Sequence, residues 1–272
     1  MDNEKFIDVR KIIKDKNPKL FRWMPWFLIN YIEKILHQNE INDFLIEHKN
    51  DHNVDFCVEV MKLLNVNIKT EGLENIPKTG KIVIAMNHPL GGMDAMALVT
   101  GLKGHREDLK FIVNDILLHI KNLNGIFLGV NKHGKNGLST RDQLLDLFAT
   151  DNAVCVFPAG LVSRKINGKV MDLEWKKTFI TFSKEHNRTI IPVFIEGELS
   201  NFFYRLANFR KKIGIKANIE MFYLSNEFFK LRGKTITIKI GNEIPFDSLP
   251  NELSQRKQTS WIKNKVYEIQ NN

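Results

Sequence analysis

The chain has 272 residues, of which 43% are hydrophobic, so it can bury a substantial core and global disorder is excluded. Its 40 Lys and Arg residues exceed its 31 Asp and Glu residues, and the net charge of +9 favours an anionic partner such as membrane lipid, nucleic acid or an acidic carrier, without choosing among them. The two cysteines form no Cys-x-x-Cys pair, so neither a zinc site nor a disulfide framework is indicated.

Residues 1–70 are predicted to form an N-terminal helical region. Aromatic residues recur at spacings of three and four from Trp23 through Trp26 and Phe27, and a run of lysines and arginines precedes them. This pattern is typical of a helix that lies in a membrane interface. A helix that packs on the main domain, with its lysines in solvent, would give the same pattern. The longest apolar stretch, 24–32, is shorter than the ~20 residues that span a bilayer, and no signal peptide is visible.

Residues 71–272 are predicted to form an α/β domain with a mostly parallel sheet flanked by helices. Short runs rich in β-branched residues alternate with helical patterns, which is the order expected of such a sheet. The predicted strands are 81–87, 109–114, 125–130, 153–158, 189–196 and 235–241. The predicted helices are 94–103, 140–150, 172–186 and a C-terminal helix at 252–269.

The stretch "NHPLGGMD" follows the first of these strands and contains a candidate acid–base pair. The Gly91-Gly92 pair permits a tight turn that brings the carboxylate of Asp94 back to the imidazole of His88. A carboxylate bound to Nδ1–H leaves Nε2 free to accept a proton, which makes the pair a candidate general base. A purely structural hydrogen-bonded pair is the alternative at this point.

A second loop, "FPAGLVSR", follows the strand at 153–158. Gly160 allows close approach of a ligand to the backbone, and Arg164, next to Ser163, can bind a phosphate or a carboxylate through two parallel hydrogen bonds. An ordinary strand-to-helix loop with a solvated basic pair is the alternative. Both loops lie at carboxyl ends of strands, where ligands bind in open α/β sheets.

Together, the two stretches resemble the signatures of the glycerolipid acyltransferases, the lysophosphatidate acyltransferase superfamily. "GIFLGVNK" and "IIPVFIEG" stand where that family has its second and fourth blocks, and the resemblance covers roughly residues 70–245. The resemblance implies acyl transfer from an acyl carrier protein or acyl-CoA thioester to the hydroxyl of a lysolipid. In it, His88 is the general base and Asp94 orients it, and no metal or other cofactor is needed.

The resemblance also implies a set of substrate-binding residues. They are Asn87, Gly91, Gly92, Lys132, Phe157, Pro158, Gly160, Ser163 and Arg164.

Four departures from the common family pattern concern acceptor recognition. His88 and Asp94 are one residue further apart than usual, and Ala159 replaces the usual glutamate. Ser163-Arg164 comes two positions late, and Lys132 stands near the place of an arginine. This variant set resembles the hemolysin-related branch, which includes O-acyltransferases of lyso-aminolipids. In that case Arg164 and Lys132 would meet an acceptor carboxylate.

The segment 201–216 combines aromatic and basic residues and contains no acidic residue. It favours an anionic membrane surface, although nucleic acid or a solvated helix face fits the pattern too. The predicted interface residues in this segment are Phe202, Phe203, Arg205, Arg210 and Lys211. With a lipid acceptor, the chain is expected to be a peripheral or monotopic protein on the cytoplasmic face of the membrane, with no specific nucleic acid partner. A thioester hydrolase and a non-catalytic lipid- or nucleic-acid-binding protein are the alternatives.

Overall fold

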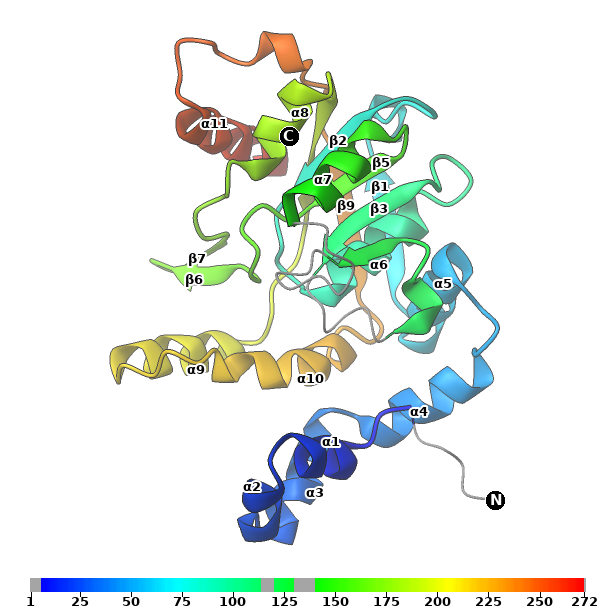
Figure 1. Ribbon diagram of the computed structural model, residues 1–272, viewed down its shortest axis with the longest axis vertical. Coiled ribbons are helices and arrows are strands. Elements are labelled where there is room, and N and C mark those ends of the chain that lie inside the picture. Colours follow the sequence, from blue (N-terminus) through cyan, green and yellow to red (C-terminus); the bar gives the residue numbers. More distant parts are fainter. Residues whose placement is uncertain (1–5, 114–119, 130–139, 272) are drawn as a thin grey trace. The chain divides into compact units, whose positions relative to one another are not determined.

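The computed structural model describes residues 6–113, 120–129 and 140–271 (Figure 1). The chain divides into two compact units. One contains residues up to Asp51 together with Ser200–Leu231, and the other contains His52–Leu199 and Arg232–Asn272.

The second unit is built on a seven-stranded sheet with the order β1-β9-β8-β2-β5-β3-β4. All neighbouring strands are parallel except β8 and β9, which are antiparallel. The five residues of β2 are all buried, as expected of a central strand that is covered on both faces. The strands are β1 (Asn67–Glu71), β2 (Ile82–Met86), β3 (Leu109–Val113), β4 (Phe127–Gly129), β5 (Ala153–Val156), β8 (Thr189–Ile195) and β9 (Thr235–Ile240).

Helices cover both faces of this sheet. The helices α7 (Thr140–Ala149), α8 (Thr178–Glu185) and α11 (Gln255–Glu268) share one hydrophobic core with alternate residues of β2 and β5, among them Val83 and Val154. The helices α5 (Asn53–Leu63) and α6 (Gly92–Gly101) pack against each other, and α6 contacts β1 and β9. A short antiparallel hairpin, β6 (Arg164–Ile166) and β7 (Lys169–Met171), lies outside the main sheet.

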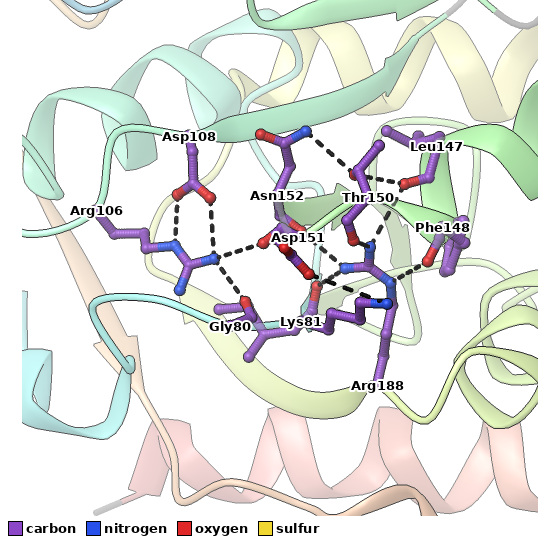
Figure 2. Close-up of polar contacts among 11 residues, drawn as sticks. Gly80, Lys81, Arg106, Asp108, Leu147, Phe148, Thr150, Asp151, Asn152 and Arg188 are labelled. Atoms are coloured by element: carbon purple, nitrogen blue, oxygen red, sulfur yellow. Dashed lines mark hydrogen bonds and ion pairs between the residues drawn. The ribbon is translucent and has the colours of Figure 1, made fainter.

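Two buried arginines anchor the amino-terminal edge of the sheet (Figure 2). Arg106 donates to both carboxylate oxygens of Asp108, at 2.5 and 3.0 Å, just before β3 begins. Arg188, just before β8, donates to five backbone carbonyls and to no carboxylate among the described residues. Burial lowers the pKa of Arg188 to about 10, so it is still charged at neutral pH. These arginines donate hydrogen bonds to backbone carbonyl groups where α7 ends and where two strands begin. This edge of the sheet is opposite the carboxyl ends of the strands, where the predicted motifs lie.

The first unit consists of helices from two distant parts of the sequence. Asn17 and Ser200 cap helices through their side chains, and Pro18 and Pro25 stand where α2 and α3 begin. The ring of His37 stacks on Phe229 with centroids 3.9 Å apart. The helices are α1 (Val9–Lys16), α2 (Pro18–Trp23), α3 (Trp26–Ile35), α4 (Gln38–Glu47), α9 (Asn201–Lys212) and α10 (Leu224–Phe229).

The predicted fold class, a mostly parallel sheet flanked by helices, is confirmed, and each of the six predicted strands is present. Three features of the secondary structure differ from the prediction. Residues 67–71, which fall largely in the region predicted to be helical, form the strand β1 of the main sheet. The helix predicted to begin at Asp172 begins at Thr178. The hairpin β6–β7 was not predicted.

Within the part of the chain that the structure describes, no helix combines the length and apolarity that crossing a membrane requires.

Candidate active site

The carboxyl ends of β2 and β5 bring the two predicted loops together. Ala85 of β2 is in register with Val156 of the neighbouring strand β5, so His88 and Phe157 leave the sheet at the same edge. Ser163, further along the second loop, donates its backbone N–H to the carbonyl of His88 at 2.8 Å. The two loops are therefore joined directly at His88.

The predicted pair of His88 and Asp94 is formed. Nδ1 of His88 lies 2.9 Å from Oδ2 of Asp94, and the backbone N–H of Leu90 donates to both carboxylate oxygens, at 3.2 and 3.0 Å. Gly91 adopts a φ of 71° as the N-cap of α6, which places Asp94 in the first turn of that helix. A carboxylate accepts hydrogen bonds only, so an ionised Asp94 keeps the proton of His88 on Nδ1 and leaves Nε2 as an acceptor.

The two side chains differ in their access to solvent. Asp94 is fully buried, whereas the His88 side chain is 17% exposed. Within the described residues, Nε2 of His88 makes no hydrogen bond. The face of the imidazole stacks on Phe157, with ring centroids 4.1 Å apart. The ring is therefore held from one face and one edge, and its second nitrogen is left to react.

Burial raises the pKa of Asp94, while the hydrogen bonds from His88 and Leu90 act in the opposite direction. A carboxyl group whose pKa is higher in the folded than in the unfolded state contributes stability that is complete below the unfolded pKa and is lost as the pH rises through the folded pKa. The stability that Asp94 contributes is therefore largest at low pH and is lost as the pH rises through its folded pKa.

We expect Asp94→Asn to be at least as stable as the parent at pH 7, because asparagine fits the same space without a buried charge. The difference in the free energy of unfolding should shrink as the pH falls toward the unfolded pKa of the carboxyl group. Urea unfolding of both proteins between pH 4 and pH 8 measures this, with the exposed Asp247→Asn as a control. A parent that is more stable than Asp94→Asn throughout this range would contradict it.

Ser163 meets a carboxylate that the sequence analysis did not single out. Its Oγ–H donates to Oδ1 of Asp172 at 2.5 Å, and the backbone N–H of His88 donates to the same oxygen at 3.1 Å. The indole N–H of Trp175 donates to Oδ2 at 2.8 Å. In the sequence, the only sign of this cluster is the stretch "DLEW", in which Asp172 stands three residues before Trp175. The sequence analysis assigned this stretch to a helix and so did not predict the cluster.

Two further residues that were predicted to bind substrate are Asn87 and Gly92, which lie at the end of β2 and at the start of α6. The amide of Asn87 donates to the carbonyl of Ile195 at 2.9 Å and accepts its N–H at 2.7 Å, so it ties the ends of β2 and β8 together. Gly92 is the exposed first residue of α6. Asn87 also lines the cavity described below, so its predicted contact with substrate stays a prediction.

The second loop is less exposed than its sequence indicates. Pro158 is buried, and Gly160 is exposed with a φ of 67°. Arg164 is largely buried, and one of its guanidinium nitrogens donates to the carbonyl of Val162 at 2.7 Å. Lys132 lies outside the described residues.

Most of the predicted membrane-interface residues are exposed, with two corrections. Trp23, Trp26 and Phe27 are exposed by 85%, 72% and 62%. Phe203 is fully buried, because the side of α9 to which it belongs packs inward, so it is not part of an exposed surface. Arg210 binds both carboxylate oxygens of the buried Glu220 at 2.7 and 3.0 Å, so its charge is paired.

The remaining predicted interface residues are exposed on α9. They are Phe202, Arg205 and Lys211.

A cavity of about 950 Å³ lies beside the histidine loop. Pro89 and Ser163 line it from the two loops, and Lys263 and Tyr267 line it from α11. Burial lowers the pKa of Lys263 and raises the pKa of Tyr267. Among the described residues, no three His, Cys, Asp or Glu side chains are grouped so that they could hold a metal ion.

The sequence model of a family described as acyltransferase matches residues 11–272 of this chain. Two curated proteins, each named lyso-glycine lipid O-acyltransferase, are similar over nearly the whole length. The protein from Phocaeicola vulgatus is 40% identical over 265 residues, which cover 97% of this chain and 95% of the relative. The protein from Bacteroides thetaiotaomicron is 41% identical over 264 residues, which cover 97% of each.

Among solved structures, the chain is similar to the crystal structure of the 1-acyl-sn-glycerophosphate acyltransferase PlsC from Thermotoga maritima. The sequence identity is 18% and the TM-score is 0.49, and the match covers 97% of this chain and 98% of the other.

Proposed function

This chain belongs to the acyltransferase family, and we propose that it transfers a fatty acyl group from an acyl carrier protein or acyl-CoA thioester to the free hydroxyl of a lysolipid. The observation that carries the proposal is the pair of His88 and Asp94, 2.9 Å apart at the carboxyl end of β2, in a chain with full-length relatives named for O-acyl transfer. The family and the relatives establish that the protein is an enzyme. The identity of the acyl donor, the identity of the acceptor and the role of His88 as the base are what we propose.

In the proposed reaction, Nε2 of His88 takes the proton of the acceptor hydroxyl. The resulting oxygen nucleophile attacks the thioester carbonyl and forms a tetrahedral intermediate. When this intermediate collapses, the C–S bond breaks, and the thiolate takes the proton from the imidazolium. Asp94 accepts the Nδ1–H bond throughout and stabilises the positive charge on the ring. The products are an ester and a free thiol, and no covalent acyl-enzyme is formed.

We propose a lyso-aminolipid, a lyso-glycine lipid above all, as the acceptor. The names of the two curated relatives support it, as do the departures from the lysophosphatidate pattern at Ala159 and around Arg164.

We expect the enzyme to acylate a lyso-glycine lipid with a kcat/KM at least tenfold higher than lysophosphatidate, which corresponds to about 1.4 kcal/mol of differential transition-state binding. The assay offers the two acceptors side by side with one thioester donor and measures thiol release and lipid product. A preference for lysophosphatidate would contradict the proposed acceptor. Thiol release that does not depend on an acceptor would contradict acyl transfer and indicate hydrolysis.

We propose that the enzyme works at the cytoplasmic face of the membrane, held by exposed aromatic residues at the end of α2 and the start of α3. Trp23, Trp26 and Phe27 are large apolar side chains that face solvent, and indole rings are enriched at the interface of a bilayer. The basic residues Arg205 and Lys211 on α9 would add attraction to anionic lipid of about 1 kcal/mol each.

We expect the protein to sediment with vesicles that contain anionic phospholipid, and the triple variant Trp23→Ser/Trp26→Ser/Phe27→Ser to bind at least tenfold more weakly. Leu128→Ser removes an exposed apolar side chain from the other unit and serves as the matched control. Equal sedimentation of the parent and the triple variant would contradict the role of these aromatic residues.

A further inference from the structure

We infer that Asp172 is a positioning residue for His88, whose backbone and neighbouring loop its buried carboxylate holds in place. The inference rests on the proposed function, in which His88 is the base. It concerns a residue outside the motifs that carry the family resemblance.

The first step of the argument is the backbone of His88, which lies beyond the end of strand β2. The residue needs partners for its N–H and C=O, because unpaired buried backbone groups are costly. Asp172 accepts the N–H at 3.1 Å, and Ser163 donates its own N–H to the carbonyl at 2.8 Å. Since the Ser163 hydroxyl also donates to Asp172, one carboxylate organises both contacts.

The second step is that the group at this position is a buried carboxylate. Asp172 is 2% exposed, and its carboxylate accepts from the His88 N–H, the Ser163 hydroxyl and the indole of Trp175. A buried carboxylate is stable only when such donors compensate for its desolvation. Burial is the main cause of the raised pKa of Asp94, but the charge of Asp172 also raises it, which places the second negative charge near the pair.

The third step is the rigidity of Asp172 itself. Its backbone N–H donates to Oη of Tyr267 at 2.7 Å, and its carbonyl accepts from Nζ of Lys263 at 2.6 Å. Both partners belong to α11, which packs on the sheet. The position of His88 is thus fixed through Asp172 by a helix of the core, while Asp94 fixes the orientation of the ring.

Two substitutions at this position test the inference. Asp172→Ala removes all three acceptor contacts, and we expect kcat to fall about 100-fold, because misplacing a catalytic group by about 1 Å costs that much. The KM values for both substrates should stay within about twofold. Asp172→Asn keeps one oxygen for His88 and Ser163 but turns an NH₂ group toward the indole N–H of Trp175, and we expect a loss of about tenfold.

A rescue and a matched control separate positioning from folding. Trp175→Phe removes the indole donor, so the double variant Asp172→Asn/Trp175→Phe should regain part of the kcat that Asp172→Asn loses. Glu174→Gln neutralises a carboxylate in the same segment that is exposed and paired with Arg256, and it should leave kcat unchanged. If Asp172→Ala does not fold, Asp172→Asn and its rescue carry the test.

An NMR spectrum of protein labelled with ¹⁵N-histidine gives a measurement that does not depend on turnover. The imidazole signal of His88 is identified as the one that is absent from the spectrum of His88→Ala. We expect this signal to shift or broaden in both Asp172 variants and to stay unchanged in Glu174→Gln. Asp172 variants with parental kcat and a parental His88 signal would overturn the inference. A parent that acylates no lysolipid would overturn the proposed function, and the His88 signal would still decide whether Asp172 positions this residue.

Discussion

His88→Ala is expected to lower kcat by about 10²- to 10⁴-fold while the protein keeps its fold, because general-base catalysis contributes a factor of this order and Nε2 of His88 is the proposed base. His88 is partly exposed and stacks on Phe157, so its removal leaves only a small surface hollow. Asp94 would keep the N–H of Leu90 as its partner. Because the buried carboxylate of Asp94 loses its imidazole partner, the thermal midpoint should fall modestly while the protein stays folded at the assay temperature.

The measurement for His88→Ala is the rate of lipid acylation with one lysolipid acceptor. Far-UV circular dichroism checks that the variant is folded, and vesicle sedimentation checks that it still binds membranes. The exposed His52→Ala is the matched control and should keep full activity. Asp94→Asn should lose less activity than His88→Ala, because the ring still packs on Phe157 although its tautomer is no longer fixed. Turnover of His88→Ala within tenfold of the parent would rule out His88 as the base.

Arg188→Met is expected to cost about 3–5 kcal/mol of stability, the largest structural effect that we predict. The guanidinium is fully buried and is the partner of five backbone carbonyls, from Ile82, Leu147, Phe148, Thr150 and Asn152 (Figure 2). Methionine fills a similar volume but leaves these oxygens without a donor, and each buried unsatisfied group costs about 1–3 kcal/mol before relaxation.

Urea unfolding at pH 7 measures the loss in Arg188→Met. The control is Arg256→Met, which removes an exposed arginine with a single ion pair to Glu174, and little change is expected there. Arg188→Lys should recover only part of the stability, because an ammonium group has three donors and cannot reach all five carbonyls. A fully stable Arg188→Met would show that this network contributes little.

The sequence predicted the parts of the fold and the site that depend on local pattern. The buried run of β2 and the two glycines after it allowed a turn that brings Asp94 to His88, and the family resemblance predicted that the pair is catalytic. Sequence could not show that Asp172 leaves the helical pattern, because its partners, His88 and Trp175 among them, are assembled only by the fold.

The surface was predicted less well for the same reason. Periodicity placed Phe202 and Phe203 in one aromatic cluster, but only the packing of α9 decides that one is exposed and the other buried. The grouping of residues 200–231 with the N-terminal helices depends on contacts such as His37 with Phe229, which are far apart in the sequence.

The hydrogen bond from the Ser163 N–H to the His88 carbonyl has a consequence for engineering. Relative to the common acyltransferase pattern, both loops carry insertions, one residue before Asp94 and two before Ser163. Because the backbones meet, the lengths of the two loops are mutually dependent. A chimera that imports either loop alone should misplace the imidazole, so both loops have to be exchanged together with the 172–175 segment that binds them.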